Sequence, residues 1–308
     1  MAEWLYEDGI GEGRAALVED GRILAARIEL PDTLRVGTIA SARLIERTLA
    51  RLEDGREVML DRAPAGVTLG GMLMVDVTRE AIPEPGRAKR ARGRVSDAAP
   101  RTGDDLRTRI AAAGQPVHVV RAHEADALEQ AGWSEVLEEA RTGEIAFPGG
   151  VLRMSPTPAM TLFDVDGDGP LDTLAVRAAT AACAAVVRHG IGGSIGIDFP
   201  TLTGKAPRHA VAAAIDAALP LPFERTAVNG FGFLQIVRPR PRASLPERLR
   251  DDPVGAAARA ALRAIERTPP AASNRHRLPA PVVARIEQTS GWLDELVRRT
   301  GRVPIFDR

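Results

Sequence analysis

The sequence predicts a mixed α/β protein, α+β overall, in which a small N-terminal β-barrel precedes an α/β domain and a helical C-terminal tail. Up to about residue 90, short runs of β-forming residues alternate with tight turns, as in small barrels. A strand, a helix and a second strand follow one another between Met160 and Asp198, and the chain after residue 245 carries helical patterns of apolar residues. We therefore place the domains at residues 1–95, 96–245 and 246–308.

The length and composition of the chain limit the classes of protein to which it can belong. The chain has 308 residues, enough for two domains, because single cores stop growing near about 250 to 300 residues. Its 41 basic residues balance 41 acidic ones, so any nucleic-acid site must be local. Cys183 is the only cysteine, which excludes an intrachain disulfide and a cysteine-based zinc site. The N-terminus does not resemble a signal peptide and no apolar run reaches about 18 residues, so we expect a cytoplasmic protein without a membrane partner.

The barrel is expected from five short strands. Two turns, Glu19 to Gly21 and Glu53 to Gly55, have the Asp-Gly sequence typical of hairpins, because glycine adopts positive φ without a Cβ clash. The expected strands are Arg14 to Val18, Arg22 to Glu29, Arg35 to Leu44, Glu57 to Asp61 and Met72 to Glu80.

A basic cluster follows the last of these strands. Its members are Arg79, Arg87, Lys89, Arg90, Arg92 and Arg94. Two interpretations remain open, a solvated linker between domains and a surface that contacts phosphates. No Phe, Tyr or Trp lies between Tyr6 and Trp133, so base stacking is not expected on this part of the chain.

Acidic residues end both strands of the strand, helix, strand segment. Asp164 lies at the end of the strand Thr161 to Val165, and Asp198 ends the strand Ile191 to Phe199. The helix between them, Leu171 to Val187, would connect the two as parallel neighbours. Functional groups in such sheets collect at the carboxyl ends of strands.

Two strand-end carboxylates with open water positions are typical of Mg²⁺ sites that also bind substrate phosphates. Asp164 and Asp198 are therefore candidate metal ligands, although an aspartate at a strand end is also a common turn former or helix cap. Asp166 and Asp168 extend the series and imitate the start of a calcium loop. Its twelfth position, however, is Ala175 rather than a bidentate Glu, which excludes that loop.

Sequence motifs around these aspartates resemble the ribonuclease E/G family. The motifs are LFDVDGDG, GGSIGIDF, GFGFLQIVRPRPRASL, TGEIAFPGG and, before them, LGGMLMVDVTREAIPEPG. The resemblance covers about residues 10–245 and implies an OB-type RNA-binding barrel followed by a DNase-I-like catalytic domain. It further implies that Asp164 and Asp198 hold Mg²⁺, with Mn²⁺ as an alternative, and that Asp166 orients the site. The implied activity is endonucleolytic hydrolysis of phosphodiester bonds in single-stranded RNA, leaving 5′-phosphate ends, in RNA processing or decay.

The sequence also departs from this family. The helix before Asp198 is mostly Ala and Val, and the segment that senses a 5′-phosphate is largely absent. The cysteine pair of the family's zinc link is absent too, so any homodimer would form without it. These departures favour an alternative, an RNA-binding protein with weak or no catalytic activity. A nuclease for another polyanion is a third hypothesis, because no base-reading device is visible.

Basic residues are the candidate RNA contacts. Lys205 lies near the metal ligands, although a solvated loop lysine is the plainer interpretation, and a second basic cluster, Arg238 to Arg242, follows a strand. The candidate RNA-binding residues are Arg79, Lys89, Arg90, Arg92, Lys205, Arg208, Arg238 and Arg240. The C-terminal helices, Asp252 to Glu266 and Ala280 to Arg299, carry an apolar stripe that we expect to pack on the catalytic domain or to form a dimer surface.

Overall fold

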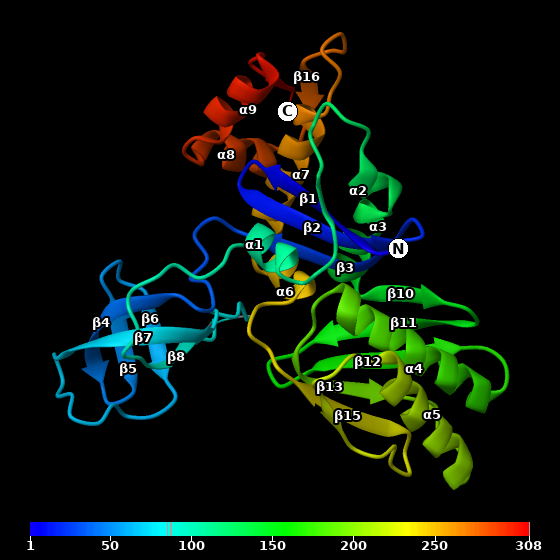
Figure 1. Cartoon of the computed structure of the whole chain (residues 1–308). Coiled ribbons are helices and arrows are strands. Elements are labelled where there is room, and N and C mark those ends of the chain that lie inside the picture. The colour runs from blue at the N-terminus through cyan, green and yellow to red at the C-terminus, as the bar shows by residue number, and fades with distance from the viewer. Residues whose placement is uncertain (85, 87, 308) are drawn as a thin grey trace. The chain divides into compact units, whose positions relative to one another are not determined.

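The computed structural model describes residues 1–84, 86 and 88–307 (Figure 1). The chain divides into two compact units, each built from separated stretches of sequence. The first unit comprises Met1–Thr33, Leu106–Trp133 and Leu249–Arg308, and the second comprises Leu34–Asp105 and Ser134–Arg248. None of the described helices has the length and apolar character needed to cross a membrane.

The first unit contains a four-stranded sheet with the strand order β3-β2-β1-β9. Strands β1 (Glu3–Gly9), β2 (Glu12–Glu19) and β3 (Arg22–Glu29) form an antiparallel meander, and β9 (Val117–Val119) adds in parallel to β1. The predicted turn between β2 and β3 is confirmed, because Asp20 and Gly21 have φ of 49° and 72°. The sequence prediction that β2 and β3 belong to the barrel is wrong, since both pair in this separate sheet.

Helices complete the first unit. They are α1 (Leu106–Ala111), α2 (Ala127–Gln130), α7 (Pro253–Glu266), α8 (Ala280–Gln288) and α9 (Trp292–Thr300), with a short pair of strands, β16 (Arg275–Arg277) and β17 (Ile305–Asp307). Helices α3 (Trp133–Thr142) and α6 (Leu245–Asp251) contain the unit boundaries. The expected single helix Ala280 to Arg299 is two helices, because Gly291 has φ 79° and separates them.

The C-terminal helices pack on the N-terminal hairpin. Their apolar core surrounds Ile10 and consists of Ile10, Ala258, Leu262, Ile265, Val282, Ile286 and Leu296. Arg14 on β2 is 1% exposed and binds Glu7 and Glu12, and the Glu12 carboxylate also accepts a hydrogen bond from Arg259 of α7. The prediction that these helices pack on the catalytic domain is therefore wrong, since matched charges and apolar residues attach them to the first sheet.

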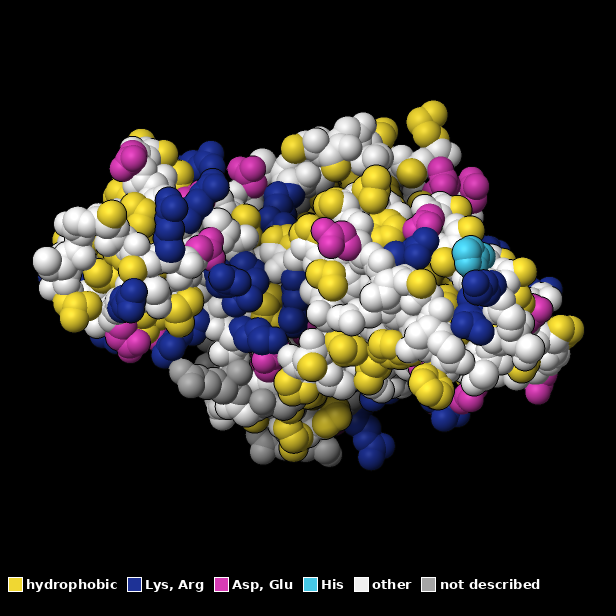
Figure 2. All heavy atoms as spheres, turned by 90° about the horizontal axis from the view of Figure 1, so that it is seen from below, with side chains coloured by type: hydrophobic (Ala, Val, Ile, Leu, Met, Phe, Trp, Pro, Cys, Tyr) yellow, Lys and Arg dark blue, Asp and Glu magenta, His cyan; other side chains and the backbone are white. Residues whose placement is uncertain are grey.

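The second unit begins with a closed five-stranded barrel, which is compatible with an OB-type barrel. Its strands are β4 (Ile39–Glu46), β5 (Leu49–Leu52), β6 (Glu57–Leu60), β7 (Met72–Arg79) and β8 (Ala91–Val95), closed in the order β4-β5-β6-β8-β7. Strand β8 lies inside the basic run interpreted as a linker or a phosphate surface. Its residues alternate, with Ala91 and Gly93 buried and Arg92 and Arg94 exposed, so the barrel is closed by a strand whose outer face is basic. Lys and Arg side chains, in dark blue, gather near the middle of the face in Figure 2.

A six-stranded sheet forms the rest of the second unit, with the order β10-β11-β12-β13-β15-β14. The strands are β10 (Glu144–Phe147), β11 (Gly150–Pro156), β12 (Thr161–Gly167), β13 (Gly193–Asp198), β14 (Glu224–Arg225) and β15 (Phe233–Arg238). Helix α4 (Leu171–Arg188) joins β12 to β13, which pair in parallel as predicted, and α5 (Lys205–Ala218) follows β13.

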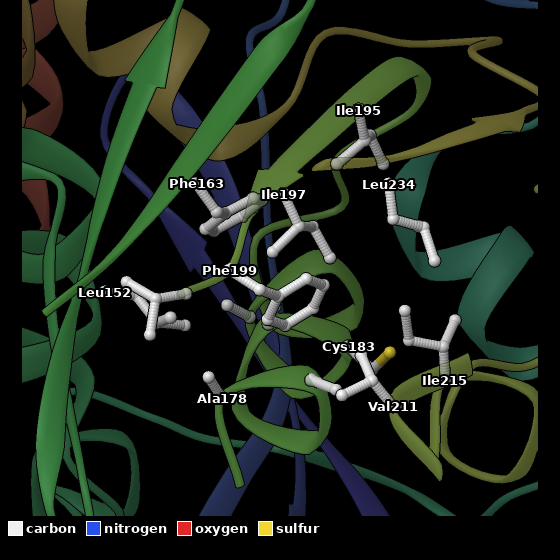
Figure 3. Packing of buried hydrophobic residues seen from close by; sticks show 14 of the residues in the cluster. Leu152, Phe163, Ala178, Cys183, Ile195, Ile197, Phe199, Val211, Ile215 and Leu234 are labelled. Carbon is white, nitrogen blue, oxygen red and sulfur yellow. The ribbon is translucent and has the colours of Figure 1, made fainter. Parts of the chain in front are cut away.

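Helices α4 and α5 cover one face of this sheet (Figure 3). Phe163, Ile195 and Ile197 point from the strands toward Cys183 on α4 and Ile215 on α5, and all five are buried. Small alanines on α4 allow the helix to pack closely on both the sheet and α5, which gives its Ala-rich sequence a packing reason. Cys183 is 1% exposed in this core, and burial raises the pKa of its thiol to about 12.

Candidate functional site

The two predicted metal ligands lie side by side at the carboxyl ends of neighbouring parallel strands. Asp164 of β12 and Asp198 of β13 are direct partners in the β-ladder. Neighbouring strands lie about 4.8 Å apart, so the two carboxylates can reach one cation between them. Phe163 and Val165 point into the core under the helices, and strand alternation therefore places Asp164 on the opposite, open face of the sheet.

Both carboxylates are exposed, and neither forms a hydrogen bond or an ion pair with any residue in the described part of the chain. Within that part, no three His, Cys, Asp or Glu side chains converge in a way that would hold a metal ion. A cation here would therefore have two protein ligands, Asp164 and Asp198. This donor set fits Mg²⁺, which is commonly held by one or two carboxylates together with waters and substrate phosphates.

Asp166 lies two residues further along β12 and is engaged differently. Its Oδ2 lies 3.3 Å from Nη2 of Arg153, and both side chains are about half exposed to solvent. With Asp168 it borders a hollow of about 390 Å³ formed by the glycines at the adjoining ends of β11 and β12. The excluded calcium loop is also absent from the structure, because the chain is helical from Leu171 onward.

Arg153 is a candidate site residue that sequence reasoning missed. It lies on β11 and is the ladder partner of Asp164. Leu152 and Met154 on either side are buried, so alternation directs Arg153 to the same open face as the aspartates. The alternation of buried and exposed residues along β11 could have shown from the sequence which face Arg153 occupies. Its position beside Asp164 could be recognised only with the knowledge that β11 pairs with β12. A guanidinium group beside a metal site can bind a phosphate through two hydrogen bonds.

An aromatic residue completes this row across the sheet. Phe233 of β15 is the ladder partner of Asp198 on the side away from Asp164. A Cβ atom built on Gly196 would lie 2.6 Å from Cζ of Phe233 and 2.8 Å from Cδ2 of Leu162. The Phe233 ring therefore lies over the bare backbone of Gly196, and the open face carries a cation, two carboxylates and an apolar ring in sequence. Sequence reasoning did not single out Phe233.

The first basic cluster is largely paired with carboxylates. Lys89 pairs with Glu84, and the Arg90, Arg92 and Arg94 guanidinium groups lie 2.9 Å from Glu57, Asp61 and Asp76, respectively. Arg79 donates to the Arg90 carbonyl at 2.7 Å, and burial lowers its pKa. Arg87 lies outside the described residues. The cluster thus has local acidic partners, with which any phosphate would have to compete.

The second basic cluster is connected to the barrel through two acidic residues of the second unit. Arg240 pairs with Glu247 and lies 3.9 Å from Glu84. Arg242 and Arg248 approach the carboxylate of Glu80 at 3.2 and 2.9 Å. These contacts show a structural function for the cluster, namely to attach the segment after β15 to the end of β7.

Arg238 lies on the other face of the sheet from the aspartates. It lies on the same face of β15 as the buried residues Leu234 and Ile236, near the Cys183 side chain of α4. Burial lowers the pKa of Arg238. Arg238 was predicted to bind RNA. It lies on the helix-covered face of the sheet, away from the two carboxylates.

Lys205 and Arg208 line a cavity of about 550 Å³ between α5 and the segment that leads to β15. The other charged residues of its wall, Asp216 and Arg225, bind one another through a hydrogen bond of 2.7 Å and a second, shorter contact. Neither Lys205 nor Arg208 has a carboxylate partner among the described residues, and Nε of Arg208 is buried without a hydrogen bond. Their positive charges are thus available to an anion in the cavity.

Comparison with known proteins adds no family assignment. No family model matches the chain, and no curated protein matches it.

Proposed function

We propose that this protein is a Mg²⁺-dependent endoribonuclease that hydrolyses phosphodiester bonds of single-stranded RNA and leaves 5′-phosphate ends. The observation that supports the proposal most strongly is the ladder pairing of Asp164 with Asp198, two exposed carboxylates that have no partner among the described residues. Two carboxylates side by side repel one another, and a cation bound between them would remove this repulsion. The sequence motifs around both residues resemble those of the ribonuclease E/G family, and this resemblance also supports the proposal.

In this proposal Asp164 and Asp198 hold the metal ion, Mg²⁺ or alternatively Mn²⁺. When bound, the ion polarises the phosphoryl oxygen and lowers the pKa of the attacking water. Arg153, beside Asp164, binds a non-bridging oxygen of the scissile phosphate and stabilises the charge that grows there in the transition state. Asp166 positions Arg153 through their ion pair.

We also propose a function for each part of the second unit. The six-stranded sheet with α4 and α5 acts as a DNase-I-like catalytic domain, and the barrel acts as an OB-type RNA-binding domain. Lys205 and Arg208 supply a phosphate contact from their cavity. The protein works in RNA processing or decay in the cytoplasm, and any homodimer forms without a zinc link.

The test is cleavage of a labelled single-stranded RNA by the purified protein. Cleavage should require Mg²⁺ and stop with EDTA, and Asp164→Asn and Asp198→Asn should each abolish it while RNA binding persists. Asp172→Asn is the matched control, because Asp172 is an exposed aspartate in the first turn of α4 that forms no ion pair within the described part of the chain. Undiminished cleavage in both site variants would overturn the metal assignment.

A second candidate function is RNA binding with weak or no catalysis. It is favoured by the absence of a third carboxylate or histidine ligand near Asp164 and Asp198 within the described residues. This candidate predicts salt-sensitive retention of RNA with no product at any Mg²⁺ concentration. The same incubation distinguishes the two functions.

A further inference from the structure

Phe231, in the loop between β14 and β15, is exposed in a way that apolar side chains seldom are. Its side chain is 85% exposed, and no other aromatic residue in the described part of the chain is classed as exposed. Water contact with a whole phenyl ring is unfavourable, and aromatic side chains are enriched at binding surfaces.

The loop that carries Phe231 is firmly held. The side-chain oxygen of Asn229 accepts hydrogen bonds from the backbone N–H groups of Phe231 and Phe233, at 2.9 and 3.0 Å. Gly232 has φ of 97°, and a Cβ atom there would lie 2.2 Å from the Phe199 carbonyl oxygen, so only glycine fits. The backbone therefore fixes Phe231 in an outward position, and its exposure is built into the loop.

The same loop adjoins the candidate metal site. The Gly232 carbonyl accepts a hydrogen bond from the N–H of Phe199, the residue that follows Asp198. Phe233, two residues after Phe231, is the ladder partner of Asp198. On its other side, the loop continues from Ala227 and Val228, which line the cavity of Lys205 and Arg208. The loop that carries Phe231 thus connects the wall of the basic cavity to the strand that lies beside Asp198.

We infer that Phe231 is a platform on which one base of single-stranded RNA stacks next to the scissile phosphate. This inference rests on the proposed function and names the feature of the substrate that the site selects. A flanking basic cavity suits the phosphates of a strand whose base lies on the ring. The barrel cannot supply the platform, because no aromatic residue occurs between Tyr6 and Trp133.

Stacking on Phe231 explains a preference for single strands. Every base has a π-face, so a single ring accepts any base and imposes little sequence preference. In a duplex both faces of each internal base are already covered by neighbouring bases, and the ring has nothing to contact. The platform therefore discriminates by strand form rather than by sequence.

The test measures binding in EDTA, so that no cleavage intervenes. A short oligouridine should bind Phe231→Ala about 5- to 100-fold more weakly than the unmodified chain, the range for loss of one base-aromatic stack. Phe231→Trp should keep the affinity, and its added indole fluorescence should be quenched by the oligonucleotide. A strand of the same length with abasic sugars should bind the unmodified chain and Phe231→Ala equally. Val303→Ala, which truncates a 71% exposed apolar residue of the first unit, is the control.

The outcomes separate the inference from the proposed function. If the protein cleaves RNA but Phe231→Ala binds oligouridine as tightly as the unmodified chain, the platform is overturned and the nuclease stands. If no cleavage occurs yet Phe231→Ala loses affinity for oligouridine and not for the abasic strand, the platform stands without the nuclease. Equal loss for the oligouridine and the abasic strand would also overturn the platform, because the contact would then not involve a base.

Discussion

Nη2 of Arg153 lies 3.3 Å from Oδ2 of Asp166, and Arg153 is at the same time the ladder partner of Asp164. One strand of the sheet thus presents a cation to two aspartates of the next strand. Asp166 thus pairs with one end of the Arg153 guanidinium group before any substrate binds. The remaining donors of Arg153 are free to face a phosphate.

The first prediction concerns this arginine. Arg153→Ala should lower kcat for RNA cleavage about 10- to 100-fold, below the largest effects of lost transition-state donors because the site is open to water. Arg153→Lys should recover only part of the rate, since an ammonium group lacks the planar pair of donors. Single-turnover cleavage measures both. Arg141→Ala, which removes an exposed arginine of α3 paired with Glu138, is the control, and equal rates for it and Arg153→Ala would contradict the role.

The second prediction concerns the loop before β15. Gly232→Ala should destabilise the protein by about 2 to 4 kcal/mol, because it forces a residue with a Cβ into positive φ and against the Phe199 carbonyl. Gly230→Ala, two residues earlier, should be nearly neutral, since nothing lies within 4 Å of its added Cβ. Urea unfolding measures the difference. A similar midpoint for the two variants would show that the loop is not held as described.

The segment from Thr161 to Asp198 could be predicted from sequence because its order is local. A strand, a helix and a strand in succession favour parallel neighbours, and the structure confirms that Asp164 and Asp198 are ladder partners. The neighbours on the outer sides, Arg153 and Phe233, were missed because antiparallel pairing had to be known first. Alternation alone says which face a side chain occupies, but not which strand lies beside it.

The barrel was predicted with two wrong strands and without two of its own, β5 and β8. A hairpin such as β2-β3 has the same sequence pattern in any sheet, and its assignment depends on β9 and α7, which lie far along the chain. Strand β8 was hidden because its outward positions are all arginine, and only Ala91 and Gly93 face the core. Local sequence patterns cannot identify the distant strands with which a hairpin pairs, and they do not reveal a strand whose core-facing residues are small.

The third prediction concerns the buried charges of the first unit. Burial by itself raises the pKa of Glu7, but Arg14, Arg263 and Arg267 around it lower the pKa to below its ordinary value of 4.5. A carboxylate with a depressed folded pKa stabilises the protein fully above its unfolded pKa and loses this contribution as the pH falls through the folded value. Urea unfolding should therefore show stability falling below about pH 4.5, and Glu7→Gln should make that fall shallower.

The same variant is testable at neutral pH. Glu7→Gln should cost about 3 to 5 kcal/mol, since it leaves arginines of a buried network without their carboxylate. Glu3→Gln, at an exposed position of the same strand, is the control. A loss of stability in acid that runs parallel in Glu7→Gln and the unmodified chain would show that other groups cause it.

The fourth prediction concerns Glu80, which is 1% exposed and lies between Arg242 and Arg248. Glu80→Gln removes the charge that both guanidinium groups approach, so the segment after β15 should detach more readily from the end of β7. Limited trypsin digestion should then cut faster after Arg242 and Arg248. Glu53→Gln, at an exposed hairpin turn, should leave the pattern unchanged. Identical digestion of Glu80→Gln and the unmodified chain would contradict this function for Glu80.

The last prediction separates the basic residues by how accessible their side chains are. Lys205 and Arg208 line an accessible cavity and have no carboxylate partner among the residues that the structure describes, whereas burial lowers the pKa of Arg238 under the helices. Lys205→Ala and Arg208→Ala should therefore weaken single-stranded RNA binding for every sequence, and each should reduce the slope of log K against log salt by about 0.7. Arg238→Gln should leave that slope unchanged. Binding titrations across a salt series measure all three variants, and an effect of Arg238 as large as that of Lys205 would mean that the partly buried Arg238 also contacts RNA.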